Sequence, residues 1–256
     1  MNFYLEKPFF IGVFQFFFII NSINAQYAFE KHPAPYYEEY GDWVVYDREN
    51  NQNKYDCTQT IDDFYGNKDD LTIQLTWFDG DVDFGMIRIF RNKKEIQEIK
   101  ESGSFSRLTM MDTKVLISDI NGDGYKDVKL IQQGTGNGVM GMLVKVLYLF
   151  QNKEGGFHKI SFDDMTFKKH REERDIDNDG NYEIVTMNLE YIKGHSYWVF
   201  NLYEYVDENL KNVNIKKGYP IAIPYTNNRS YKITKDISVS QLKDYEREFP
   251  KEYEVN

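Results

Sequence analysis

DINGDGYKD at residues 119–127 and DIDNDGNYE at residues 175–183 are two acidic segments of the same length and the same spacing. Each places an oxygen-bearing side chain at its positions 1, 3, 5 and 9, and a glycine at its position 6. Alternate residues of a tightly curled loop can point inward, and glycine adopts backbone conformations that a Cβ disfavours. The spacing therefore predicts two curled loops with converging oxygens, named here loop one (residues 119–127) and loop two (residues 175–183).

Converging carboxylates require a compensating positive charge, because two of them about 4 Å apart repel by roughly 4 kcal/mol at an effective dielectric constant near 20. An oxygen cage completed by the backbone carbonyl at position 7 suits a hard cation, so we predict two Ca²⁺ sites. The alternative is a pair of acidic turns without metal. The predicted ligands are Asp119, Asn121, Asp123, the Tyr125 carbonyl and Asp127 in loop one, and Asp175, Asp177, Asp179, the Asn181 carbonyl and Glu183 in loop two.

The two loops differ from each other in charge, and both differ from EF-hands at their C-terminal ends. Loop two carries four side-chain carboxylates against three in loop one, so it is predicted to bind the ion more tightly. An EF-hand loop ends in a bidentate Glu at position 12 and leads into a helix. Position 12 is Leu130 in loop one and Thr186 in loop two, and β-branched residues surround both. That composition predicts strands at residues 128–133 and 184–190.

Three further segments share a hairpin pattern and form an internal repeat. They lie at residues 86–99, 147–160 and 200–213. The repeating unit is a hairpin followed by a strand that carries a metal loop, which predicts propeller blades or a related stacked sheet, with a β-sandwich as the alternative. The predicted fold is all-β, a β-propeller-like stack of antiparallel hairpins with two DxDxDG-type metal loops and a short C-terminal helix.

These motifs resemble a known group of proteins. The pattern D-x-[DN]-x-D-G-x-x-[DE] feeding a strand is similar to the FG-GAP/VCBS-type calcium repeats of extracellular β-propellers. The order of calcium loop, Gly-rich segment and the hairpin YLFQNKEGGF (residues 148–157) resembles bacterial secreted β-propeller-like calcium-binding proteins, which include periplasmic lysozyme inhibitors. The resemblance spans about residues 71–225. It implies calcium binding and a protein partner, a lysozyme-like enzyme in the case of the inhibitors.

The N-terminal residues are typical of a targeting segment. Lys7 precedes an apolar run at residues 9–20, and a small-residue ending at Ala25 follows it. A run of this length is too short to span a bilayer as a helix, and a retained membrane anchor is the alternative. We expect a signal peptide at residues 1–25, a secreted or periplasmic protein, and no membrane association after cleavage.

The rest of the chain is predicted to form a single β domain at residues 26–256. Its predicted parts are an N-terminal arm at 26–70, a repeat core at 71–226 and a helical tail at 227–256. Smaller predictions are strands at 43–46 and 71–78, a polar loop at 56–70, an acidic turn at 79–85, a solvated connection at 161–174, an edge strand at 219–225 and a helix at 240–249.

Composition limits the classes of function. A net charge of −10 without a Lys/Arg cluster argues against nucleic acids and anionic membranes as partners. Cys57 is the only cysteine, so it forms no internal disulfide and is predicted to be a buried, inert thiol. The four histidines lack zinc-binding spacing and no nucleophile motif occurs, so we expect no enzyme.

The Gly-rich segment at residues 134–141 matches the spacing of a dinucleotide fingerprint but precedes a strand instead of a helix. It is either a flexible connection or a partner-recognition loop. We therefore expect a calcium-binding protein that acts by binding another protein, with inhibition of a cell-wall lytic enzyme as the sharper form. The alternatives are a carbohydrate-active enzyme with an acidic cleft and a surface adhesion module.

Overall fold

The computed structural model describes residues 27–47, 54–78, 85–102, 113–133, 137–166, 171–192, 194–225, 237 and 239–256. The predicted signal peptide and almost all of the predicted acidic turn lie outside these residues. No helix among the described residues is both long and apolar enough to cross a membrane.

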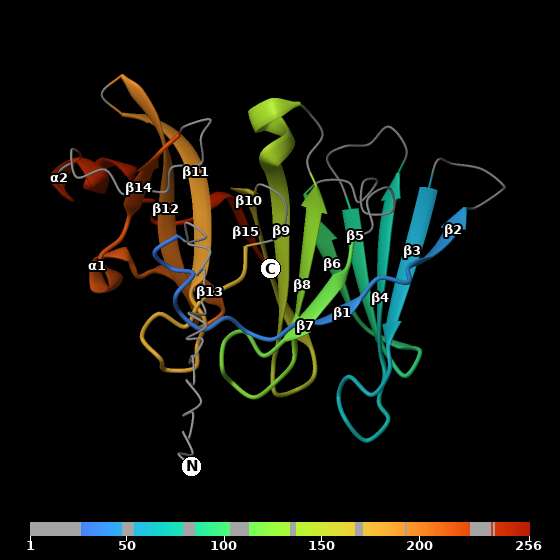
Figure 1. Ribbon diagram of the computed structural model, residues 1–256. Helices are drawn as coiled ribbons and strands as arrows, with labels where there is room; N and C mark the ends of the chain where they lie inside the picture. The colour runs from blue at the N-terminus through green and yellow to red at the C-terminus, as the bar shows by residue number, and fades with distance from the viewer. Residues whose placement is uncertain are drawn as a thin grey trace, which may run out of the picture.

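Three antiparallel sheets stand beside one another and make up most of the molecule (Figure 1). The first sheet contains β2 (Val44–Asp47), β3 (Lys54–Ile61), β4 (Leu71–Phe78), β5 (Gly85–Arg91) and β6 (Lys94–Glu101), in that order. The middle sheet has the order β1 (Glu38–Tyr40), β7 (Val115–Ser118), β8 (Asp127–Gln133), β9 (Leu143–Gln151), β10 (Phe157–Met165) and β15 (Lys251–Val255). The last sheet contains β11 (Ile184–Ile192), β12 (His195–Val206), β13 (Asn209–Asn212) and β14 (Ile221–Pro224).

The central strands of the middle sheet are buried on both faces. Along β9, Leu147 and Leu149 belong to the core shared with the first sheet. Val146, Tyr148 and Phe150 alternate with them and belong to the core shared with the last sheet. Successive residues of a strand point to opposite faces, so a strand covered on both sides is apolar along most of its length, as β9 is.

The predicted all-β class and the antiparallel hairpins are confirmed. The hairpin β5–β6 turns at Asn92 and Lys93, and β12–β13 turns at Asp207 and Glu208. All four turn residues have positive φ, between 48° and 67°, which is the turn geometry whose twist matches that of paired strands. The described residues form no closed barrel or propeller.

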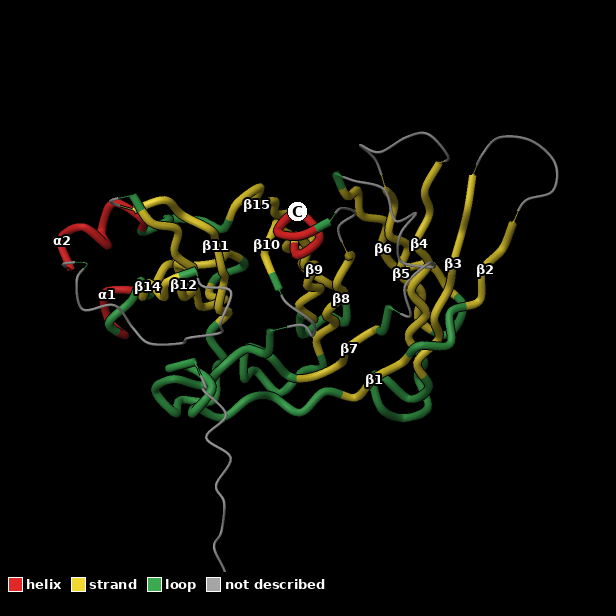
Figure 2. The backbone as a smooth tube through the Cα atoms, turned by 45° about the horizontal axis from the view of Figure 1, so that its top comes forward, coloured by secondary structure: helices red, strands yellow, loops and turns green. Residues whose placement is uncertain are grey.

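The N-terminal arm crosses all three sheets. Phe29 packs against Phe200 of the last sheet, with ring centroids 5.2 Å apart. Further along, β1 pairs with β7 of the middle sheet and β2 pairs with β3 of the first. Figure 1 shows this blue segment running across the stack, and Figure 2 shows it on one side of the three sheets.

Two predictions about the ends of the domain need correction. Residues 54–61, most of them inside the predicted polar loop, form strand β3, because they pair with β2 and β4 and bury Cys57, Gln59 and Ile61 on one face. The helix predicted at 240–249 is short: α2 (Val239–Leu242) is followed by a 3₁₀ turn (Lys243–Tyr245). The chain then continues as β15 beside β10, a strand that the sequence pattern does not predict.

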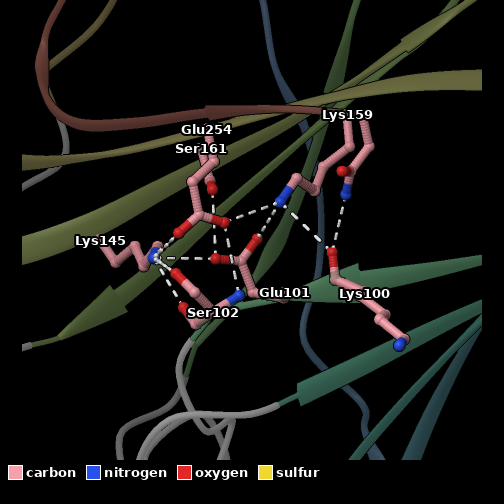
Figure 3. Close-up of polar contacts among 8 residues, drawn as sticks. Lys100, Glu101, Ser102, Lys145, Lys159, Ser161 and Glu254 are labelled. Atoms are coloured by element: carbon pink, nitrogen blue, oxygen red, sulfur yellow. Dashed lines mark hydrogen bonds and ion pairs between the residues drawn. The ribbon is translucent and has the colours of Figure 1, made fainter.

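A buried ion network joins the first sheet to the middle sheet (Figure 3). Lys159 of β10 is fully buried, and its ammonium lies 2.8 Å from Glu101 at the end of β6. Lys145 of β9 pairs with the same carboxylate at 2.9 Å, and Ser161 donates a hydrogen bond to it at 3.1 Å. Glu254 of β15 lies 3.3 Å from Lys159. Because buried charges are stable only when paired, the network holds these four strands together.

Candidate metal centre

Loop one connects β7 to β8 and is closed by bonds to its own backbone. The carboxylate of Asp119, at position 1, accepts hydrogen bonds from the N–H groups of Asp123 at 3.1 Å and Gly124 at 2.9 Å. The carboxylate of Asp123, at position 5, accepts one from the N–H of Tyr125 at 2.8 Å. Gly124, at position 6, has a φ of 88°. This conformation explains why the pattern requires a glycine there.

Loop two leads into β11 and repeats these bonds at the same positions. Asp175 accepts hydrogen bonds from the N–H groups of Asp179 and Gly180, both at 3.1 Å. Asp179 accepts one from the N–H of Asn181 at 2.9 Å. Gly180 has a φ of 90°. Equal bonds at equal positions make the loops two copies of one structural motif.

The two loops also lie against each other. The N–H of Tyr182 in loop two donates a hydrogen bond to the carbonyl of Ile120 in loop one at 3.0 Å. Ile120 is buried in the core between the middle and last sheets. The N–H of Asp175 donates to the carbonyl of Pro33 in the arm at 2.9 Å. The paired loops therefore lie where the middle sheet, the last sheet and the arm meet.

Carboxylates gather differently in the two loops. In loop two, one oxygen each of Asp175, Asp177 and Asp179 lies within 4.8 Å of the others, so this cluster can hold a metal ion. Within the part of the chain that is described, loop one has no three carboxylates so close together. Its position 3 is Asn121, whose amide donates a hydrogen bond to Asp123 at 3.0 Å.

The position-9 acid of loop one, Asp127, binds backbone groups. It is fully buried, and its two oxygens accept hydrogen bonds from the N–H groups of Ile120 at 2.9 Å and Gln151 at 3.0 Å. Burial raises the pKa of Asp127 to about 8 against the opposing effect of these two bonds, and the charges of Asp123 and Asp119 add to the rise. Asp127 thus links loop one to β9.

Glu183 takes the same position in loop two, but one of its oxygens meets a cation. Glu183 is fully buried, and its Oε2 accepts a hydrogen bond from the N–H of Ile176 at 2.7 Å. Its Oε1 lies 2.8 Å from the ammonium of Lys217, which also pairs with Asp177 and lies 3.8 Å from Glu204. Burial acts to lower the pKa of Lys217, but hydrogen bonds and charges of Asp177 and Glu183 outweigh it and raise that pKa above its ordinary value. Lys217 therefore stays charged.

Sequence reasoning missed Lys217 and Glu204 because both lie outside the nine-residue motif. Lys217 ends the helical turn α1 (Asn214–Lys217), and Glu204 is on β12. With Asp177 and Glu183, Glu204 forms a second group of carboxylates within 4.8 Å of one another. Pairing of β11 with β12 assembles this group. No local spacing in the sequence signals that contact.

The solvated connection predicted at residues 161–174 is wrong for its described part. Glu173 is only 1% exposed. It lies 2.6 Å from the ammonium of buried Lys129 and accepts hydrogen bonds from the hydroxyls of Tyr37 and Tyr148. The local sequence suggests that the Glu173 carboxylate is exposed. It is buried because its partners come from three other segments, namely the arm, β8 and β9. These groups pair with one another, so the cluster links the arm and the middle sheet to the segment that precedes loop two.

Two other predicted features have clear positions. Of the Gly-rich segment, the described residues form a 3₁₀ helix (Gly138–Met142), with Met140 62% exposed. Strand β9 follows it directly, as predicted. Cys57 is buried as predicted, and burial raises the pKa of its thiol to about 12, which keeps it protonated.

Comparison with known proteins yields no relative. The chain matches no family model, no curated protein and no solved structure. Its function is therefore inferred from its residues and their geometry.

Proposed function

We propose that this chain is a secreted or periplasmic calcium-binding protein that acts by binding another protein. The observation that carries the proposal is loop two, where Asp175, Asp177 and Asp179 converge in a loop whose three hydrogen bonds from backbone N–H groups to Asp175 and Asp179 recur at the same positions of loop one. Convergent carboxylates at a tight turn are a donor set that hard cations prefer. Ca²⁺ suits such an irregular all-oxygen cage better than Mg²⁺, which demands a near-ideal octahedron.

The ion in this proposal is structural. The paired loops lie at the junction of the middle and last sheets, so cations bound there would strengthen that junction. In this interpretation the three sheets correspond to successive blades of a propeller-like stack, and a metal loop follows each of the first two of the three repeated hairpins. Export rests on the apolar run at residues 9–20.

Binding, not catalysis, is the proposed activity. A net charge of −10 favours a partner with a basic surface, because complementary charge speeds and orients association. Met140, which is 62% exposed, offers an apolar contact on the surface. Together with the resemblance to calcium-binding lysozyme inhibitors, these features favour a cell-wall lytic enzyme of the lysozyme type as the partner.

Calorimetric titration with Ca²⁺ tests the metal, and a turbidity assay of cell-wall lysis tests the partner. We expect binding in the range of about 10⁻⁴ to 10⁻³ M that is typical of extracellular modules. We also expect a muramidase to be inhibited more strongly with calcium than with chelator. The variant for comparison is Asp179→Ala, which removes one predicted metal ligand of loop two. Asp179 is exposed, so the substitution leaves the core unchanged. Absence of calcium binding refutes the metal site, and an uninhibited muramidase refutes the partner.

A further inference from the structure

Lys217 is a buried cation directed into the metal-binding loop from a different part of the chain. Its side chain is only 7% exposed, and it ends α1 just before Gly218, whose φ of 75° terminates the turn. The ammonium contacts Asp177 and Glu183, with Glu204 3.8 Å away. A lysine buried to this extent normally has a defined role, because burying its charge is costly unless it is paired.

Asp177 is shared between two sets of partners. It belongs to the cluster with Asp175 and Asp179 that can hold a metal, and also to the group with Glu183 and Glu204 that surrounds Lys217. A divalent ion bound to Asp177 would therefore lie close to the Lys217 ammonium. Like charges at such a separation repel strongly away from bulk water.

We propose that Lys217 is an internal competitor for the metal of loop two, an inference that rests on the proposed metal site. In the metal-free protein the ammonium pairs with both Asp177 and Glu183 and offsets part of their negative charge, so loop two keeps its shape without an ion. When a divalent ion binds, Asp177 must turn from Lys217 to the ion, and the ammonium is left with Glu183 and Glu204. Loop two thus binds its metal more weakly than its four carboxylates predict, and remains folded at low calcium.

Loop one provides an internal reference. Its position-9 acid, Asp127, is held by the backbone N–H of Gln151 where Glu183 is held by a lysine. In the described part of the chain, no Lys or Arg forms an ion pair with Asp119, Asp123 or Asp127. Removing Lys217 should therefore change the affinity of loop two alone.

The test is a Ca²⁺ titration of the full chain followed by NMR at the amides of Gly124 and Gly180. Each amide is hydrogen-bonded to the position-1 carboxylate of its own loop, so each reports one site. Lys217→Met should tighten binding at Gly180 by about ten-fold or more, within the usual range of coupling between two binding events. Binding at Gly124 should stay unchanged. The matched control, Lys216→Met, removes the same charge from the exposed neighbour of Lys217 and should leave both sites near wild type.

Two more variants allow for a folding defect. Lys217→Gln removes the charge but keeps a hydrogen-bond donor for Glu183, and should also tighten loop two. Lys217→Arg keeps the charge and should retain wild-type affinity. If loop two binds calcium in the wild type but Lys217→Met and Lys217→Gln leave its affinity unchanged or weaker, the competition is refuted while the metal site stands. If Gly180 reports no calcium in any variant, the proposed metal site fails together with it.

Discussion

Gly122 of loop one lies so close to Gly180 of loop two that a Cβ added at residue 122 would be 2.4 Å from the Gly180 carbonyl oxygen. Gly122 also has a φ of 72°, a conformation that side chains disfavour. The equivalent position in loop two is Asn178, whose φ is 62°. A positive φ at this position of the loop thus tolerates a side chain, as Asn178 shows. Residue 122 must be glycine mainly because the backbone of loop two lies against it.

Gly122→Ala should destabilise the protein by about 2–4 kcal/mol, since it adds a clash with fixed backbone to a strained φ. Gly124→Ala is the matched control: its φ is 88°, but an added Cβ meets nothing within 4 Å. It should cost about 1 kcal/mol, from the backbone conformation alone. Urea denaturation in excess calcium and in chelator measures both. If the two variants lose the same free energy of unfolding, the contact between the loops does not contribute to stability.

Local features of this protein could be predicted from its sequence, and contacts between distant segments could not. Loops one and two are specified within nine residues each, and their hydrogen bonds follow that spacing. The strand at residues 71–78 is confirmed with the same bounds because it alternates cleanly. By contrast, Lys217 reaches loop two, and Lys129 reaches Glu173, only after the sheets have assembled.

Strands rich in polar and charged residues are also hard to predict from the sequence. Residues 54–61 and 251–255 carry polar and charged side chains at a frequency that suggests loop or helix, yet both segments form strands. Each gains its stability from a neighbouring strand, β4 in one case and β10 in the other. The residues on the partner strand determine this pairing, and a short stretch of sequence does not show them.

Removal of calcium should lower the melting temperature. A ligand bound only to the folded state adds about 1.4 kcal/mol per site at ten times its Kd. Two sites would add about 3 kcal/mol, or roughly 6–12 °C for a domain of this size. Calorimetric scans in calcium, magnesium and excess chelator should rank stability in that order. The Asp123→Ala/Asp179→Ala double variant should melt at the same temperature in calcium and in chelator; a shift that persists in it would place the ions elsewhere.

The buried network of Figure 3 should respond unequally to loss of its two central members. Glu101→Gln leaves both Lys159 and Lys145 without their shared carboxylate, and should cost about 3–5 kcal/mol. Lys159→Met should cost less, because Lys145 still pairs with Glu101. A double-mutant cycle should show that the combined loss of stability is smaller than the sum of the two single losses. Strictly additive losses would contradict the network.

As a control, Arg88→Met breaks an exposed pair with Glu98 and should cost less than about 1 kcal/mol.

Stability should fall in acid partly through His158. Burial lowers the pKa of His158 below its ordinary value of 6.5, while the charge of Glu208 opposes the shift. Between the unfolded and folded pKa values the unfolded chain binds more protons, so this contribution is complete above about pH 6.5 and is lost as pH falls toward the folded pKa. His158→Gln should flatten that part of the pH dependence in denaturant titrations between about pH 7.5 and 5. His195→Gln, at an exposed position on β12, should keep the wild-type slope, and an unchanged slope in His158→Gln would assign the acid sensitivity to carboxylates.

The N-terminal arm should contribute to the stability of the whole domain, because it contacts every sheet. Phe29 is 1% exposed and forms a cluster of three rings with Tyr27 and Phe200, in which each pair of ring centroids is 5.2 Å apart. Phe29→Ala should therefore cost about 3–5 kcal/mol, the usual range for a buried aromatic side chain.

Tyr36→Ala is the control. It changes an arm residue that is 84% exposed, and its stability should stay within about 0.5 kcal/mol of wild type. Denaturant unfolding followed by tryptophan fluorescence measures both: Trp43 packs against the core between the first and middle sheets, and Trp198 lies in a core of the last sheet. A single transition that moves to lower denaturant in Phe29→Ala would show that the arm joins the sheets into one cooperative unit, whereas a loss confined to the last sheet would contradict that role.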